Sequence, residues 1–310
     1  GCEALMPGRN GASLAPHTFG ERFLTRAEEF GQLCVGIDPH EQLLRDWGLD
    51  VSVAGLRRFS QTCVEAFAST ACVVKPQVAF YEAFGSAGLA VLEETIAELR
   101  RHGVLVIADA KRGDIGSTMA GYARAWVDSG SPLCSDAVTV SPWLGFESLR
   151  PVIDLADKNG AGVIVLAATS NPEAPTVQRA FAPVLNAQSG SVASDKKGPQ
   201  TAGERTQVTL AQDVVNRVAA ANRQYGAEAG NLGVVIGATV DSPPVLDEVG
   251  GMVLMPGVGA QGGTMDDVKR IAGKATHLVS PNVSRGILKC GPDVGALGNA
   301  VAKLTRDMLV

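Results

Sequence analysis

Eight short apolar runs recur along this chain and constrain its fold more than any other feature. Their hydrophobicity is continuous rather than alternating, which is typical of strands buried on both faces, as in parallel sheets. Each intervening segment is long enough for a crossover helix, and Leu89, Leu92, Ile96 and Leu99 form a helical stripe in one of them. Eight strand–helix units predict an α/β fold, a single (β/α)8 TIM barrel with strands at 33–37, 71–74, 104–108, 137–140, 162–167, 232–236, 252–255 and 277–279.

A doubly wound open sheet is the competing fold, because it also alternates strands with helices. Such a sheet usually has fewer strands, and no Gly-x-Gly-x-x-Gly motif follows the first apolar run. The closed barrel is therefore favoured, and we expect it to occupy residues 19–310.

Two segments do not fit the barrel pattern. Residues 1–18 have the composition of a flexible leader or of a remnant of an expression vector. Residues 186–207 are polar and of low complexity, which predicts a mobile surface insertion. A lid that closes over a substrate is the alternative for this second segment.

Composition narrows the class of partner. The net charge of −5 and the pI near 5.5, without a long Lys/Arg cluster, argue against nucleic acid and anionic membranes. No apolar stretch reaches the ~18 residues of a membrane span. The six cysteines and four histidines show no metal-ligand spacing, so we expect reduced thiols, a cytoplasmic location and no metal site. A small-molecule substrate fits these properties best.

Charged residues gather where the second and third runs end. Lys75 follows one run, and Asp109, Lys111 and Asp114 follow the other. Alternate strand residues share a face, so Asp109 and Lys111 should point the same way. We interpret the four residues as a catalytic network of alternating positive and negative charges. Such a network can keep a lysine protonated beside a reacting carbon. In the plainer alternative, Lys111 reaches solvent and Asp114 caps the helix that begins near residue 116.

The loops after the seventh and eighth runs predict a phosphate site, because barrel enzymes often bind phosphate there. Glycines allow backbone N–H groups to approach phosphate oxygens, and an arginine can form a bidentate pair with them. The alternative is a pair of glycine-rich turns with a surface arginine. The candidate substrate-binding residues here are Pro256, Gln261, Gly262, Gly263 and Arg285.

Three further polar residues are candidates for substrate contacts. Asp38, after the first run, could accept hydrogen bonds from sugar hydroxyls, or could simply start a turn before Pro39. Thr118 lies four residues after Asp114 and would share a face with it if the segment between them is helical. Ser170 could bind the edge of a heterocycle, or could be an ordinary turn residue.

The residues that follow successive strands resemble those of the orotidine 5′-monophosphate decarboxylases, and within them the type 2 branch. Several motifs in the right order are more specific than any one of them. The resemblance covers residues 20–305 and implies a (β/α)8 barrel that forms a homodimer, needs no cofactor and converts orotidine 5′-monophosphate to uridine 5′-monophosphate and CO2. The matching motifs are Gly36-Ile-Asp38-Pro39, Lys75-Pro-Gln-Val-Ala-Phe-Tyr81, Asp109-Ala-Lys-Arg-Gly-Asp-Ile115, Thr169-Ser-Asn-Pro172, Pro256-Gly-Val-Gly-Ala-Gln-Gly-Gly263 and Ser280-Pro-Asn-Val-Ser-Arg285.

The same resemblance implies a role for each candidate residue. Lys75, Asp109 and Lys111 would form the network of one subunit, with Lys111 as the proton donor to C6 of the ring. Asp109 could act by repelling the substrate carboxylate or by preorganising the lysine, and the sequence leaves both open. The remaining contacts would come from Asp114 and Thr118 of the partner subunit, and from residues that bind ribose (Asp38, Lys75), pyrimidine (Ser170) and phosphate (Gln261, Arg285).

Two other functions remain as alternatives. Mg²⁺-dependent sugar-phosphate decarboxylases or aldolases of the same barrel superfamily carry an acidic metal ligand at the end of the second strand. Lys75 stands there in this chain, and an ammonium group does not bind a metal. A non-catalytic nucleotide-binding barrel is the other alternative, and the complete set of Lys75, Asp109, Lys111 and Asp114 counts against it.

Overall fold

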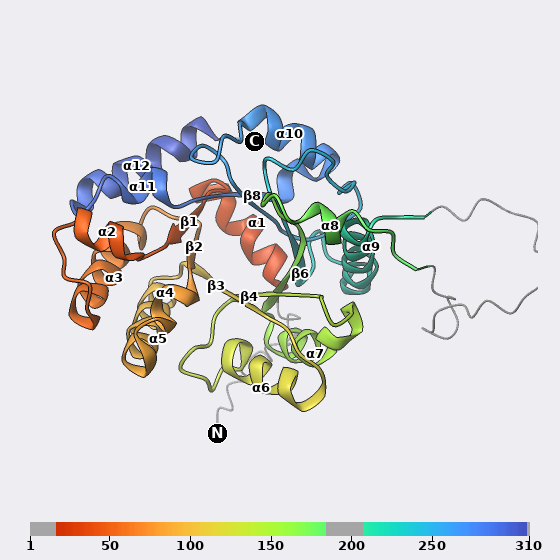
Figure 1. Cartoon of the computed structure of the whole chain (residues 1–310), viewed down its shortest axis with the longest axis horizontal. Helices are drawn as coiled ribbons and strands as arrows, with labels where there is room; N and C mark the ends of the chain where they lie inside the picture. Colours follow the sequence, from red (N-terminus) through yellow and green to blue (C-terminus); the bar gives the residue numbers. More distant parts are fainter. Residues whose placement is uncertain (1–16, 184–206, 309–310) are drawn as a thin grey trace, which may run out of the picture.

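The computed structural model of this chain describes residues 17–183 and 207–308. In these residues eight parallel strands close into a barrel in sequence order, with β8 pairing to β1 (Figure 1). This confirms the predicted (β/α)8 barrel. Residues 1–16 of the expected leader and 186–206 of the expected insertion lie outside the described residues. The strands are β1 (Cys34–Ile37), β2 (Val73–Pro76), β3 (Leu105–Arg112), β4 (Ala137–Val140), β5 (Gly162–Ala168), β6 (Leu232–Ile236), β7 (Val253–Pro256) and β8 (Val279–Val283).

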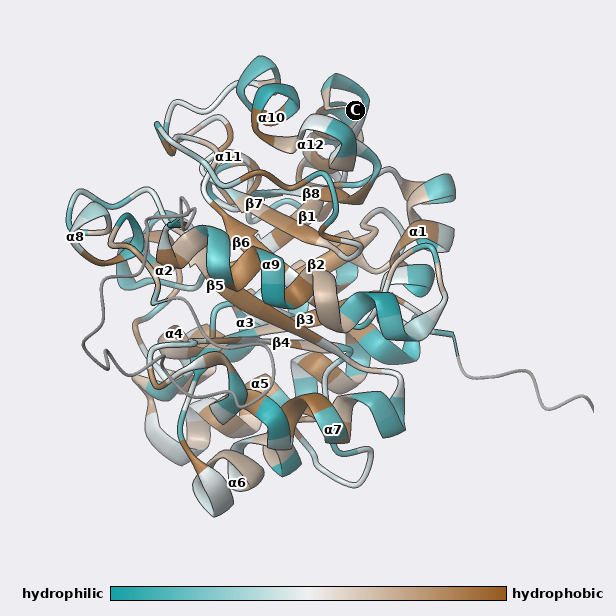
Figure 2. Cartoon of the chain, turned by 90° about the vertical axis from the view of Figure 1, so that its right-hand side faces the viewer, coloured by the Kyte–Doolittle hydropathy of each residue, from teal (hydrophilic) through white to brown (hydrophobic). Residues whose placement is uncertain are grey.

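Helices surround the barrel, and the apolar strands lie inside them (Figure 2). The predicted stripe lies on α5, where Leu92, Ile96 and Leu99 are buried and Leu89 is partly buried against the core. The α-helices are α1 (Phe19–Phe30), α2 (Glu41–Asp46), α3 (Val53–Phe67), α4 (Val78–Glu82), α5 (Gly85–Arg101), α6 (Gly116–Val127), α7 (Arg150–Asn159), α8 (Pro175–Gln178), α9 (Leu210–Asn222), α10 (Met265–Ala272), α11 (Arg285–Leu288) and α12 (Val294–Asp307), and the 3₁₀ helices are η1 (Phe146–Leu149), η2 (Arg223–Tyr225) and η3 (Gly273–Leu278).

Three strands, β2, β3 and β8, extend by two or more residues beyond the carboxyl ends that the sequence predicts. Lys75 belongs to β2, and β3 continues as far as Arg112. The prediction for β8 was wrong in position: residues 273–278 form η3, and the strand contains Pro281 and Asn282. Polar residues in these strands face a polar cavity at the end of the barrel, so they do not interrupt the strands. The apolar pattern therefore ends before the strand does.

Helix α1 closes the amino end of the barrel, opposite to α2 and α8 (Figure 2). Thr18 and Glu21 form a capping box that fixes the start of this helix. Phe19 and Phe23 then enter the apolar cluster inside the barrel, where they pack with residues of several strands. The two phenylalanines therefore fill the amino end of the barrel, and the carboxyl end is the one left open.

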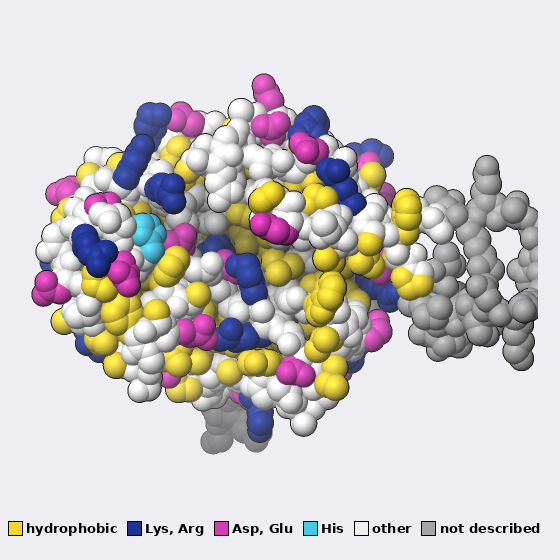
Figure 3. All heavy atoms as spheres, viewed as in Figure 1, with side chains coloured by type: hydrophobic (Ala, Val, Ile, Leu, Met, Phe, Trp, Pro, Cys, Tyr) yellow, Lys and Arg dark blue, Asp and Glu magenta, His cyan; other side chains and the backbone are white. Residues whose placement is uncertain are grey.

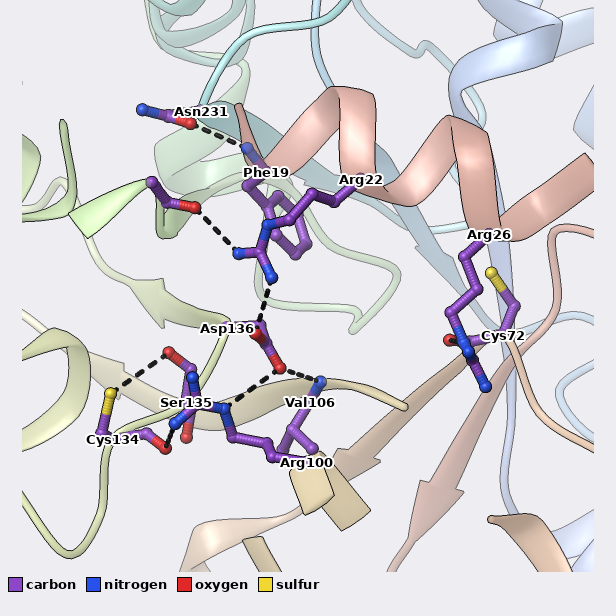
Figure 4. A network of polar contacts seen from close by, with 11 residues as sticks. Phe19, Arg22, Arg26, Cys72, Arg100, Val106, Cys134, Ser135, Asp136 and Asn231 are labelled. Atoms are coloured by element: carbon purple, nitrogen blue, oxygen red, sulfur yellow. Dashed lines mark hydrogen bonds and ion pairs between the residues drawn. The ribbon is translucent and has the colours of Figure 1, made fainter. Parts of the chain in front are cut away.

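A buried carboxylate attaches α1 to the barrel (Figure 4). Asp136 directly precedes β4, and its side chain is only 7% exposed. Its Oδ1 accepts from Nη1 of Arg22 on α1 at 2.8 Å, and its Oδ2 accepts from the Val106 backbone N–H at 2.9 Å. The Nε of Arg100 lies 3.5 Å from the same Oδ2. Asp136 therefore links α1, β3, β4 and α5.

Replacing Asp136 with asparagine should lower the free energy of unfolding by about 2–3 kcal/mol, because a buried carboxylate with three donors loses its charge. Urea unfolding measures this change. Asp307→Asn is the matched control, since Asp307 forms an exposed ion pair with Lys303 and should barely affect stability. Equal effects of the two substitutions would contradict a special role for Asp136.

Candidate active site

The charged cluster lies on an irregular part of β3. Ala108 pairs with Val138 and Arg112 pairs with Val140, so residues 109–111 lie opposite the single residue Thr139 of β4. Lys111 has a φ of 48°, the one positive φ outside glycine among the described residues. Bulges of this kind change the direction of side chains and occur next to functional sites. Asp109 and Lys111 do face the same site, as predicted, but on a bulged strand.

The Asp109 carboxylate accepts four hydrogen bonds. Its Oδ2 lies 2.6 Å from the Lys75 Nζ, and its Oδ1 lies 2.6 Å from the Lys111 Nζ. The Thr139 hydroxyl donates to Oδ1 at 2.8 Å. The Gln77 amide, with its nitrogen facing Asp109, donates to Oδ2 at 3.1 Å. A carboxylate offers about four acceptor positions, so that of Asp109 is saturated.

Burial and charge oppose each other in this network. Burial alone would raise the pKa of Asp109, but Lys75 and Lys111 outweigh it and hold that pKa well below its usual range. Burial alone would lower the pKa of Lys75, but Asp109 and Asp38 outweigh it and raise that pKa above its usual range. Both groups are therefore charged at neutral pH. Of the three charged side chains, that of Lys111 is the most exposed, at 43%, against 6% for Lys75 and 7% for Asp109.

A cavity of about 320 Å³ lies at this end of the barrel. Figure 3 shows the hollow at the centre of this face, with Lys and Arg side chains in it. The Oδ1 atom of Asp38 is buried there and accepts no hydrogen bond from the described residues, which suits it to receive a ligand hydroxyl. Seven of the predicted site residues line the cavity: Asp38, Lys75, Asp109, Lys111, Pro256, Gln261 and Arg285.

Asp114 and Thr118 do not line this cavity. Helix α6 begins at Gly116, so the helical segment that would place the two residues on one face does not extend to Asp114. The helix-capping alternative also fails, because Ile115 is the N-cap residue and the Asp114 Oδ1 accepts from the Ile115 N–H at 2.7 Å. Neither residue contributes to the cavity of its own subunit.

Three other predicted residues also lie outside the cavity lining. Ser170 lines a neighbouring cavity of about 260 Å³ between the loops after β5 and β6. The backbone N–H groups of Gly262 and Gly263 donate within their own loop, to the carbonyls of Gly259 at 2.9 Å and Gly257 at 3.0 Å. These two backbone N–H groups are therefore already paired within the loop, and the predicted phosphate ligands that line the cavity are the side chains of Gln261 and Arg285.

Two residues of the network were not among the sequence candidates. Thr139 lies in an apolar run, where a single hydroxyl side chain is the only signal of another role. Gln77 follows Lys75 and Pro76 directly, and its bridge to Asp109 across β2 and β3 was not evident from spacing. Both residues could have been found by asking which side chains complete the hydrogen bonds of a buried carboxylate.

The described residues hold neither a metal centre nor a membrane-spanning helix. No group of three or more His, Cys, Asp or Glu side chains there could hold a metal ion. No helix in the same residues is long and apolar enough to cross a membrane. The described cysteines, Cys34, Cys63, Cys72, Cys134 and Cys290, carry free thiols.

Comparisons with known proteins agree on one family. Residues 31–194 match the family model described as "Orotidine 5'-phosphate decarboxylase / HUMPS family". Orotidine 5′-phosphate decarboxylases from Corynebacterium glutamicum and Corynebacterium efficiens are each 58% identical over 292 residues, which cover 94% of this chain and 97% and 96% of theirs. A Streptomyces avermitilis crystal structure, titled as a candidate for the same enzyme, is 45% identical with a TM-score of 0.85, covering 97% of this chain and 98% of that one.

Proposed function

Because this chain belongs to the orotidine 5′-phosphate decarboxylase / HUMPS family, we propose that the cavity at the carboxyl end of its barrel is the catalytic centre. The protein is a carboxy-lyase that converts orotidine 5′-monophosphate to uridine 5′-monophosphate and CO2 in pyrimidine biosynthesis. One observation supports this location most directly: a lysine ammonium is held 2.6 Å from a saturated carboxylate at the cavity wall.

Lys111 is the proton donor in the proposed mechanism. The bond between C6 and the carboxylate carbon breaks, CO2 leaves, and the electron pair stays on C6. The Lys111 ammonium stabilises this charge and transfers a proton to C6, after which solvent reprotonates the amine. Asp109 acts mainly by positioning Lys75 and Lys111, because its four acceptor positions are occupied before substrate enters.

The rest of the cavity would bind the nucleotide away from the reacting carbon. Arg285 and Gln261 would bind the phosphate, with Pro256 and the glycine-rich loop beside it, and Asp38 and Lys75 would bind ribose hydroxyls. Ser170 would contact the pyrimidine if the loop after β5 closes toward the main cavity. Binding energy from the phosphate would then support the placement of the carboxylate near Asp109.

We also propose a homodimer in which Asp114 and Thr118 complete the partner's cavity. Exposed apolar side chains lie on the loops after β3 and β4, which touch at Gly113 and Ser141: Ile115, next to Asp114, is 61% exposed, and Trp143 and Leu144 are 71% and 53% exposed. Large side chains exposed together in this way are typical of protein interfaces. A second copy of the chain would cover them and bring its acidic residue to the rim of the site.

A cytoplasmic location is part of the same proposal. Free cysteines, most of them buried, suit a reducing compartment, where disulfides are rare. The substrate is a soluble nucleotide, which also fits this location.

Incubating the purified protein with orotidine 5′-monophosphate should deplete the orotate chromophore at the same rate with and without EDTA. The reason is that Lys75 occupies the position where the metal-dependent relatives place an acidic ligand, and an ammonium group cannot replace it. Absorbance measures the rate.

Lys111→Ala protein purified in parallel is the control, because it reveals any contaminating host enzyme. Absence of turnover by the wild-type protein would refute the assignment. A rate that EDTA abolishes and Mg²⁺ restores would favour the metal-dependent alternative.

A further inference from the structure

We propose that Thr139 is a positioning residue that holds Lys111 in its reactive place, an inference that rests on the proposed role of Lys111. The Thr139 side chain is fully buried at the bulge of β3. Its Oγ1 accepts from the Lys111 backbone N–H at 2.9 Å and donates to the Asp109 Oδ1 at 2.8 Å. One hydroxyl therefore contacts both the backbone of the proton donor and the carboxylate that binds its ammonium.

The direction of these two hydrogen bonds is fixed. An N–H group can only donate and an ionised carboxylate can only accept, so the single hydroxyl proton of Thr139 must point at Asp109. Since Lys111 Nζ also binds Asp109 Oδ1, the contacts form a closed ring from the Lys111 backbone through Thr139 and Asp109 to the Lys111 side chain. Such a ring restricts where the ammonium can lie.

The backbone of Lys111 needs this support. Its φ of 48° lies in the left-handed region, which a side-chain-bearing residue adopts only when its surroundings impose it. In the bulge, the N–H group of Lys111 finds its acceptor in the Thr139 side chain rather than in the β4 backbone. Removing the hydroxyl would leave this N–H without its acceptor and allow the bulge to shift.

Thr139→Val is the sharpest test, because valine has nearly the same shape and lacks only the hydroxyl. We expect kcat to fall by about 10- to 100-fold, the size of effect expected from one hydrogen bond to a charged group or a small misplacement of a reacting group. The KM for orotidine 5′-monophosphate should change by less than about threefold, because Thr139 is not among the residues that line the cavity.

Two variants separate positioning from packing. Thr139→Ser keeps the hydroxyl and should keep kcat within about threefold of the wild-type value. Thr62→Val is the matched control, since Thr62 is a buried threonine on α3 whose hydroxyl donates to the Arg58 carbonyl at 2.9 Å, away from the cavity. If Thr139→Val does not fold, Thr139→Ala takes its place in the comparison with Thr139→Ser.

The proposal would be overturned if Thr139→Val kept the wild-type kcat. It would also be overturned if kcat fell in Thr139→Ser as far as it falls in Thr139→Val. A fall in Thr62→Val as large as that in Thr139→Val would also overturn it, because general loss of a buried hydrogen bond would then explain the result. None of these outcomes affects the proposed function, which the wild-type turnover and the Lys111→Ala variant test separately.

Discussion

Replacing Lys111 with alanine should lower kcat by roughly 10³- to 10⁵-fold, because the variant loses both the proton donor and the charge beside the carbanion. Binding of uridine 5′-monophosphate, measured by calorimetry, should remain within about threefold, since the phosphate and ribose contacts are elsewhere in the cavity. The variant should fold, because Lys75 still pairs with Asp109 and the Lys111 side chain is already 43% exposed.

Lys303→Ala is the control for this substitution. Lys303 also pairs with an aspartate, Asp307, but on the exposed surface of α12, and its loss should leave kcat unchanged. If Lys111→Ala lost binding and catalysis to the same extent, Lys111 would be a binding residue and the proposed proton transfer would have to come from another group.

Mixing inactive Asp114→Asn and Lys111→Ala dimers should restore activity to about a quarter of the wild-type rate. If Asp114 completes the partner's cavity, each hybrid dimer contains one site with both residues intact and one site with neither. Random exchange makes about half of the dimers hybrids, which sets the expected recovery. The rate after denaturation and joint refolding, compared with each variant treated alone, gives the measurement.

Lys111→Ala mixed with Asp109→Asn is the matched control. These two residues belong to the same subunit's site, 2.6 Å apart, so every site in every hybrid remains broken. Recovery in this control, or no recovery in the first mixture after native gels have shown exchange, would contradict the shared site.

Much of the fold was predictable because buried parallel strands have a clear apolar pattern. The barrel closes with eight strands as predicted, seven of them near their expected positions, and α5 buries most of the expected stripe. The position of β8 was not predictable, because Pro281 and Asn282 have the composition of a loop and become strand residues only beside a polar cavity. Strand propensity depends on such surroundings, which local sequence does not contain.

The candidate site was predicted only in part. The pairing of Asp109 with Lys75 and Lys111 followed from their places at the ends of adjacent strands, and the structure shows it. The position of Asp114 depends on where α6 begins, and boundaries of this kind are weakly encoded. Thr139 was missed because its role depends on a register shift between β3 and β4, which no spacing in one strand reveals.

The bulge in β3 has a consequence for enzyme engineering. On a regular strand, Asp109 and Lys111 would each face a separate partner residue, and no single hydroxyl could connect the backbone of one to the carboxylate of the other. Transplanting the Asp-x-Lys sequence to another barrel would therefore transfer the two residues without the register shift that positions them. A working graft requires the shifted register and the hydroxyl-bearing residue of β4 to be moved together with the motif.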